Sequence, residues 1–273
     1  MKNTKIIIAT HKQYQMPNDE IYLPVHVGKE GKEELGYVGD NTGINISLKN
    51  LNFCELTGLY WARHNLNSDY IGLAHYRRHF KGKQKDKNKF NTILTSQELT
   101  DLLNETDIVL PKKRKYYIET IYSHYAHTLH AEDLDITREI ISEIYPNYLK
   151  SFDKIMKSRS AHMFNMFIMK KEYVEEYCDW LFEILFELEK RLDISHYSAF
   201  EARLYGRVSE VLLDVWLDYK GYEYKEIPVV YMGKTNWLKK GTSFLKAKFF
   251  GKKYKESFWK TNKGVNWVCI YIY

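Results

Sequence analysis

Short apolar runs alternate along this chain with longer segments in which apolar residues recur at helical spacing. Runs of strand length occupy residues 5–10, 69–75 and 107–110, and residues 22–27 and 161–169 give two further candidates. Continuous apolar runs of this length are typical of strands buried on both faces. Their alternation with helices predicts an α/β domain with a mixed, mostly parallel sheet flanked by helices.

Five segments have apolar residues on one helical face. The predicted helices cover residues 45–65, 95–104, 134–157, 172–192 and 199–219. We expect Ser47 to cap the first helix and Ser96 to begin a capping box at the second. Pro146 is expected to interrupt the third helix.

The C-terminal stretch has a different composition from the rest of the chain. Residues 234–263 hold ten lysines and one acid, interleaved with bulky aromatic side chains. We therefore divide the chain into a domain of residues 1–232 and a basic, aromatic segment of residues 233–273. Such a mixture favours a surface element on an anionic membrane. The alternatives are nucleic-acid binding, which we do not favour, and packing of the aromatic side chains onto the domain.

Several classes of protein are disfavoured by the sequence. The three cysteines, Cys54, Cys178 and Cys269, are widely spaced, which favours free thiols in a reducing cytosol. No secretion signal and no apolar run of about 18 residues is present. The patterns GxxxxGK[ST], GxGxxG and GxSxG are also missing. We expect a cytoplasmic protein that is peripheral on the inner face of the cell membrane.

Cationic side chains follow three of the predicted strands. They stand at residues 11–12, in the HYRRH cluster of residues 75–79, and at residues 112–114. Ligands of α/β sheets lie at the carboxyl ends of strands, and arginine matches the geometry of phosphate oxygens. The pattern therefore predicts a site for an anion such as a diphosphate, although loop cations that merely face solvent would give the same pattern.

Three histidines, His124, His127 and His130, recur at a spacing of three residues. That spacing would place the imidazoles on one helical face, as a metal site requires. A structural or substrate-contacting role is the alternative that we favour. Glu132 and Asp133 follow directly and make this a strongly polar stretch.

Six motifs between about Lys5 and Val230 resemble a bacterial family of capsular and exopolysaccharide glycosyltransferases long catalogued as a domain of unknown function. They read ATHKQYQMP, VGDNTGINISLKN, FCELTGLYWARHN, DYIGLAHYRRHF, NMFIMKKE and YGRVSEVLLDVWL. The resemblance implies a GT-A-like fold and a nucleoside-diphosphate sugar donor, expected to be a UDP-sugar. It also implies galactose or galactofuranose as the sugar and a lipid-linked glycan acceptor in capsule, exopolysaccharide or O-antigen synthesis.

The resemblance also implies roles for individual residues in donor binding. Those residues are Thr10, His11, Tyr14, Asp40, Asn41, Asn45, His75, Arg77 and Arg78. The first three would hold the nucleoside, and the next three would contact the base or ribose. For Asp40, a turn-forming role is the alternative interpretation.

One position departs from the pattern of GT-A enzymes. Where an Asp-x-Asp usually holds Mn²⁺ or Mg²⁺ against the diphosphate, this chain has His75, Tyr76 and Arg77. Two arginines would neutralise the leaving diphosphate without a metal ion, which we favour slightly. A metal ion bound by His75 is the alternative.

An inverting transfer needs a carboxylate to accept the proton of the acceptor hydroxyl. Glu210 is our first candidate because it lies in an otherwise apolar stretch, where burial raises a carboxyl pKa, and Asp133 is the second. The alternative is a structural role, in which Glu210 forms an ion pair with Arg203 or Arg207. We expect His130, Asn165 and Arg203 to contact the acceptor. A non-catalytic nucleotide- or carbohydrate-binding subunit of a polysaccharide assembly complex is the alternative function.

Overall fold

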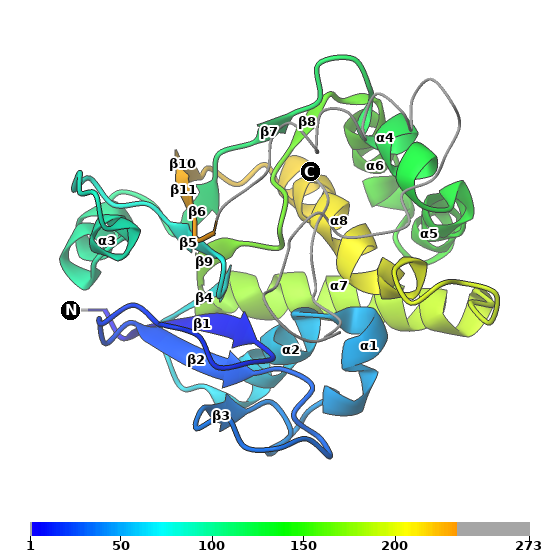
Figure 1. Cartoon of the computed structure of the whole chain (residues 1–273). Helices are drawn as coiled ribbons and strands as arrows, with labels where there is room; N and C mark the ends of the chain where they lie inside the picture. Colours follow the sequence, from blue (N-terminus) through cyan, green and yellow to red (C-terminus); the bar gives the residue numbers. More distant parts are fainter. Residues whose placement is uncertain (1, 234–273) are drawn as a thin grey trace.

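The apolar run near the N-terminus forms strand β1 (Thr4–Thr10), which lies in the middle of the sheet. A computed structural model describes residues 2–233 and shows helices packed around this sheet (Figure 1). Strand β1 pairs in parallel with β2 (Tyr22–His26) on one side and with β4 (Tyr70–His75) on the other. Strand β3 (Val38–Gly39) continues the parallel arrangement beyond β2.

The other half of the sheet is mixed. Strand β9 (Phe167–Lys170) runs antiparallel to both β4 and β6 (Ile108–Pro111), and β10 (Lys225–Ile227) is parallel to β6. Strands β5 (Arg78–Phe80) and β11 (Val229–Tyr231) form an antiparallel ribbon at the end of β4. The predicted mixed, mostly parallel sheet with flanking helices is thereby confirmed, while β5, β10 and β11 are strands that the apolar pattern missed.

The longest helices bury their apolar faces against the sheet and against each other. The helices are α1 (Asn50–Phe53), α2 (Leu56–Asn65), α3 (Ser96–Leu103), α4 (Ile121–Thr128), α5 (Ala131–Ile144), α6 (Leu149–Lys157), α7 (Lys171–Arg191) and α8 (Leu204–Lys220). Helices α2 and α7 contact β4 and each other, and α8 crosses α7 (Figure 1). Helices α4, α5 and α6 form a group beside α8. Pro146 separates α5 from α6, as predicted, and begins the 3₁₀ turn η3 (Pro146–Tyr148).

The long helix predicted over residues 45–65 is broken. The chain forms the 3₁₀ turn η1 (Ser47–Lys49), then α1, then α2, and the break falls at Cys54, whose φ is +52°. A residue in that region cannot continue a right-handed helix. The helical periodicity does not reveal this break, because the apolar side chains on both sides of it are buried in the same core.

One predicted helix cap is wrong and a second is displaced by one residue. The Ser47 hydroxyl donates to the Asp40 carboxylate instead of capping a helix. At α3 the N-cap is Thr95, whose hydroxyl accepts from the Glu98 backbone N–H while the Glu98 carboxylate accepts from the Thr95 N–H. The capping box is therefore present, one residue earlier than predicted.

Among residues 2–233 no helix is both long enough and apolar enough to cross a bilayer. The basic segment predicted to lie on a membrane falls outside the described residues, apart from its first position.

Candidate active site

The ends of β1 and β4 bring two polar segments together. The strands are parallel, and Ala9 pairs with His75, so residues 10–12 and residues 75–79 leave the sheet at the same edge. The ring of Tyr76, fully buried, meets the ring of His11 edge-on with centroids 5.5 Å apart. Two of the three predicted cationic strand ends therefore converge on one site.

Aromatic rings support the cations at this edge. The Lys12 Nζ lies 5.5 Å and the Arg77 Cζ lies 5.2 Å from the centroid of the Tyr76 ring. The Arg78 Cζ lies 4.3 Å from the centroid of the Phe164 ring. Such cation–π contacts orient a guanidinium without neutralising it.

The pKa of the His11 imidazole reflects both its burial and the positive charges around it. Its pKa is lowered to about 4, first by burial and then by the positive charges of neighbouring side chains. Those side chains are Lys12, Arg203, Lys32 and Arg77. They come from the end of β1, the turn before α8, the loop after β2 and the end of β4. Burial alone would lower this pKa, but four cations that converge on one edge of the sheet also favour an anion there.

His75 occupies the position at which the metal-binding motif was expected. It is buried at the end of β4, and its pKa lies well below the usual value. Burial is the main cause, followed by the charges of Arg78, His11, Arg77 and Arg203. Within residues 2–233, no three His, Cys, Asp or Glu side chains are arranged to hold a metal ion. The charged side chains that act on His75 are arginines, whereas Mn²⁺ and Mg²⁺ bind carboxylate oxygens, so these residues do not fit either ion.

The cations that follow β6, the third predicted strand end, contact other residues. The Lys113 ammonium, just beyond β6, lies 3.6 Å from the Asp214 carboxylate. The Arg114 guanidinium stands over the ring of Tyr116, 4.9 Å from its centroid. Since antiparallel β9 separates β6 from β4, these cations are not delivered to the site at His11 and His75.

The break in the predicted helix shapes the site through Cys54 and Gly206, two residues for which the sequence predicted no role. Arg203 reaches Cys54, with both Nε and Nη2 3.3 Å from the Sγ atom. A Cβ atom on Gly206 would lie 3.1 Å from the Cys54 Cβ. Glycine therefore lets α8 approach the break closely enough to place Arg203 beside the ends of β1 and β4.

The Asn165 side chain connects the segment after Cys54 with helix α8. Its Nδ2 donates to the Glu55 carboxylate (3.0 Å) and to the Gly206 carbonyl (2.9 Å), and its Oδ1 accepts from the Ser209 hydroxyl (2.8 Å). Asn165 and Phe164 both have positive φ, 54° and 80°. Such backbone costs about 1–3 kcal/mol per residue and persists where the surrounding contacts enforce it. The polar atoms of Asn165 thus hold protein segments in place.

The two candidate bases lie in different surroundings. Glu210 follows Ser209 on α8 and is 1% exposed. Arg207, one of its proposed ion-pair partners, stands over the Phe200 ring instead, with Cζ 4.0 Å from the centroid. Asp133 is fully buried and accepts from the hydroxyls of two tyrosines, one of which is Tyr197 at 2.7 Å.

Asp133 belongs to a second polar cluster. Tyr125 is the other hydroxyl donor, at 2.8 Å, and burial raises the pKa of Asp133. The His130 ring stacks on Tyr197 with centroids 4.2 Å apart, and the His130 Nε2 lies 3.1 Å from the Glu201 carboxylate. Glu201 is two residues from Arg203, so this cluster adjoins the turn that reaches the cationic site.

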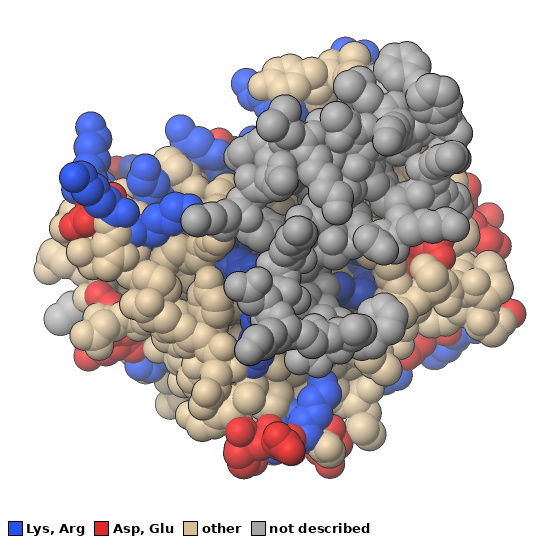
Figure 2. Space-filling model, viewed as in Figure 1, with Lys and Arg blue, Asp and Glu red and all other residues tan. Residues whose placement is uncertain are grey.

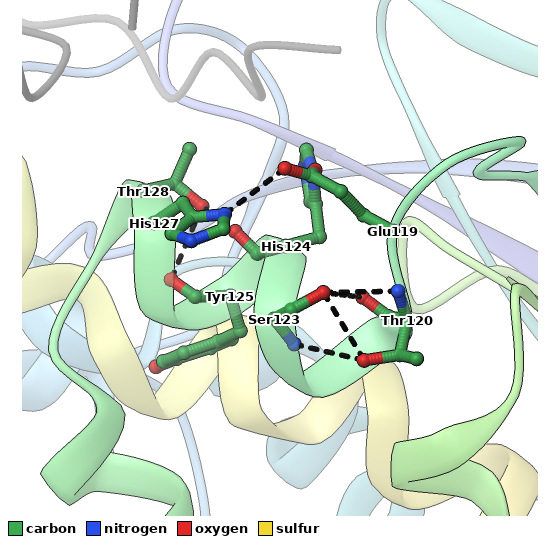
Figure 3. A network of polar contacts seen from close by, with 7 residues as sticks. All are labelled: Glu119, Thr120, Ser123, His124, Tyr125, His127 and Thr128. Carbon is green, nitrogen blue, oxygen red and sulfur yellow. Dashed lines mark hydrogen bonds and ion pairs between the residues drawn. The ribbon is translucent and has the colours of Figure 1, made fainter. Parts of the chain in front are cut away.

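The other two histidines of the triplet share one carboxylate (Figure 3). The His124 Nδ1 lies 2.7 Å from Oε2 of Glu119, and the His127 Nδ1 lies 2.9 Å from Oε1. Burial acts to raise the pKa of Glu119, but the hydrogen bonds to both histidines outweigh it and the pKa is lowered. Glu119 therefore organises the start of α4, where Thr120 caps the helix.

The loop after β2 is folded around Asp40. This fully buried carboxylate accepts from the N–H groups of Gly28 (2.8 Å) and Lys29 (3.0 Å) and from the Ser47 hydroxyl (2.5 Å). The Asn45 Oδ1 accepts from the Ser47 N–H. These contacts match the turn-forming interpretation of Asp40. The loop also carries Lys32, which contributes charge at His11.

The remaining donor-binding candidates flank the site. The Thr10 hydroxyl is buried and donates to the Lys12 carbonyl. The Tyr14 ring packs edge-on against Tyr76, with centroids 5.2 Å apart. The Asn41 side chain is only partly buried and donates to Glu30. Thr10 and Tyr14 thus support the edge at which His11 stands.

A solved structure has the same fold as this chain. It is the apo structure of WbbM, a bifunctional glycosyltransferase, with a TM-score of 0.80 and 30% sequence identity over 85% of this chain. The match covers 46% of the WbbM chain, so this chain spans about half the length of that protein. The chain therefore has an α/β fold of the same class as this glycosyltransferase.

Within that class, the chain belongs to the family DUF4422, a domain of unknown function, whose model matches residues 5–221. The family predicted from the six sequence motifs is confirmed. No curated protein matches the chain.

Proposed function

We propose that this domain transfers a sugar from a nucleoside-diphosphate donor to an acceptor hydroxyl. The observation that carries the proposal is the cationic site at the ends of β1 and β4, where burial and four positive charges hold the pKa of His11 at about 4. A diphosphate has the negative charge that such a site favours. The similarity to the bifunctional glycosyltransferase WbbM supports the same activity.

In this mechanism Arg77, Arg78 and Arg203 neutralise the leaving diphosphate. Charge develops on the diphosphate as the bond to the anomeric carbon breaks, and preorganised cations stabilise it most in a site removed from water. His11 and His75 are neutral and can each donate one N–H to an anionic oxygen. We propose that this clamp replaces the divalent cation of an Asp-x-Asp site.

A buried carboxylate completes the reaction. We propose that Glu210 accepts the proton of the acceptor hydroxyl, whose oxygen then displaces the diphosphate at the anomeric carbon. Asp133 is the second candidate for this role. His130, which contacts Glu201, and Arg203, two residues after Glu201, would contact the acceptor, while Asn165 positions the helix that carries Glu210.

The identity of donor and acceptor is proposed from the family resemblance. The donor is a UDP-sugar, with galactose or galactofuranose as the sugar. The acceptor is a lipid-linked glycan in the synthesis of capsule, exopolysaccharide or O-antigen. The domain would then work at the inner face of the cell membrane as a peripheral protein.

Thermal unfolding with a panel of nucleotides tests the donor site. Free UDP or UDP-galactose at about 100 times its dissociation constant should raise the free energy of unfolding by about 2.7 kcal/mol. We expect the same stabilisation with EDTA and with Mn²⁺, because the clamp is made of arginines. Stabilisation that requires Mn²⁺ would overturn the metal-free clamp, and no stabilisation by any nucleotide would overturn the donor site.

Turnover separates the enzyme from a binding subunit. The replacement of the Asp-x-Asp by His75, Tyr76 and Arg77 is the observation that favours a non-catalytic subunit. Such a subunit would be stabilised by UDP without releasing UDP from a UDP-sugar. We expect UDP release that increases with an added lipid-linked acceptor.

A further inference from the structure

A second basic region lies outside the proposed donor site. Lysine occupies every second position from the residue after β5 to the first residue of η2 (Lys89–Thr92). These are Lys81, Lys83, Lys85, Lys87 and Lys89. A second run, Lys112–Lys115, follows β6 and holds four cations. We call the two runs together the basic rim.

The two runs emerge side by side although residues 90–111 separate them in the sequence. The Lys81 N–H donates to the Pro228 carbonyl (2.8 Å), and the Lys112 N–H donates to the preceding carbonyl, that of Ile227 (2.9 Å). Both runs are thus anchored to the link between β10 and β11. Figure 2 shows Lys and Arg side chains gathered along the upper left edge of this face, over the β5, β10 and β11 region of Figure 1.

The charges of the first run are not neutralised within the described part of the chain. No ion pair among residues 2–233 involves Lys81, Lys83, Lys85 or Lys87. The single acid of the loop, Asp86, accepts from the Asn88 N–H (2.7 Å) and from the Asn91 side chain (2.9 Å). The acid therefore holds the loop in shape while the lysine side chains face solvent.

Large apolar side chains extend from the same rim. Directly after Lys115 come a buried tyrosine and then Tyr117 and Ile118, whose side chains are 82% and 61% exposed. They follow Lys115, which is exposed and forms no ion pair among residues 2–233, and such a combination is unusual on a surface that faces only water.

We propose that the basic rim docks on an anionic phospholipid membrane, with Tyr117 and Ile118 entering the interface. Lysines are attracted to anionic headgroups, tyrosine is favoured at the headgroup level, and an aliphatic side chain gains by leaving water. A nucleic acid would satisfy the lysines and stack on Tyr117, but it offers no apolar environment to the exposed Ile118, whereas a membrane interface suits all three. All residues of this surface belong to the described domain.

Vesicle binding by the full chain tests the proposal. We expect co-sedimentation with vesicles that contain phosphatidylglycerol and little with pure phosphatidylcholine vesicles. The variant K83Q/K85Q/K87Q should bind the anionic vesicles at least tenfold more weakly, because each lysine contributes to the attraction. The variant Y117S/I118S should also bind more weakly, and its remaining binding should be more sensitive to salt.

The matched control is K150Q/K170Q/K190Q, which removes the same charge from α6, from β9 and from α7. It should bind anionic vesicles as the unchanged chain does. Equal binding by the two lysine variants would overturn the proposal, as would equal binding to the two kinds of vesicle. Displacement of the chain from vesicles by an oligonucleotide that the rim variant no longer binds would assign the rim to nucleic acid instead.

The result is independent of the proposed transferase activity. The altered lysines are exposed and are not among the residues whose charges act on His11 or His75, so stabilisation by UDP should be the same in all variants. A chain that binds vesicles but no nucleotide would retain the docking surface and lose only the proposed function.

Discussion

His11 and His75 are neutral imidazoles in a positively charged site. Their low pKa values come first from burial and then from nearby arginines and lysines, as described for the ends of β1 and β4. Two protonated histidines would add to the repulsion among the positive charges of this site. The neutral rings avoid that repulsion and still offer one N–H each to a ligand. Protonation at these residues is therefore linked both to folding and to anion binding.

Stability should fall as the pH is lowered through the window set by His11. The unfolded chain binds a proton near pH 6.5 and the folded chain only near pH 4, so the unfolded state holds more protons between these values. The free energy of unfolding should decrease towards lower pH by up to about 1.4 kcal/mol per pH unit for this group. Urea titrations at several pH values measure it, and H11Q should reduce the slope. An unchanged slope in H11Q would contradict the assignment.

Exchanging the two candidate carboxylates for amides distinguishes the proposed bases. E210Q should lower kcat by about 10²–10⁴-fold while stabilisation by UDP is kept, because the base acts on the acceptor and not on the donor. D133N should change kcat much less, since two tyrosine hydroxyls already engage Asp133. The opposite order of effects, measured as UDP release with acceptor present, would make Asp133 the base.

At the scale of elements, the approach of α8 to the break at Cys54 decides where Arg203 lies. The positive φ of Cys54 ends α1, and Gly206 removes the side chain that would keep α8 away. The break at Cys54 and helix α8 together determine the position of Arg203.

Gly206→Ala tests this close approach. Alanine usually stabilises a helix by about 1 kcal/mol relative to glycine. Here the new Cβ would lie 3.1 Å from the Cys54 Cβ and 3.2 Å from its Sγ. We expect a net loss of about 1 kcal/mol by urea denaturation, together with weaker UDP binding. The double variant C54G/G206A should recover most of both losses, because glycine removes the clash and suits a φ of +52°. Failure of this rescue would locate the strain elsewhere.

At the scale of the whole molecule, the cationic site collects charge from segments that are far apart in the sequence. Lys32 comes from the loop after β2, Arg77 from the end of β4 and Arg203 from the turn before α8. The field at His11 is their sum, so each cation should contribute to anion binding.

Removing one cation should weaken nucleotide binding without unfolding the domain. R203Q should reduce the affinity for UDP about tenfold, equivalent to about 1.4 kcal/mol, and lessen the dependence of binding on salt. R207Q, four residues further along, is the control, since Arg207 stands over Phe200 and is not among the charges that lower the His11 pKa. Titration calorimetry measures both. Equal losses in the two variants would mean that charge at a distance, rather than this site, sets the affinity.

Sequence patterns sufficed for much of the fold and for part of the site. The apolar runs predicted β1, β4 and β6, because a strand buried on both faces has to be apolar throughout. The rule that ligands lie at the ends of parallel strands then led to His11, His75, Arg77 and Arg78. The short strands β5, β10 and β11 were missed, since three residues carry too little periodicity to reveal a strand.

The sequence by itself determined the local chemistry: which segments are strands and helices, that cations follow the strands, and that the chain is a member of its family. Only the tertiary structure decided which of these cations meet. Antiparallel β9 separates the end of β6 from the end of β4, so Lys113 turns to Asp214, while Arg203 arrives from a turn more than 120 residues beyond Arg77. Propensity and hydrophobic pattern act over one element at a time, whereas the position of a side chain in a site depends on how separate elements pack, at Cys54, Gly206 and Asn165.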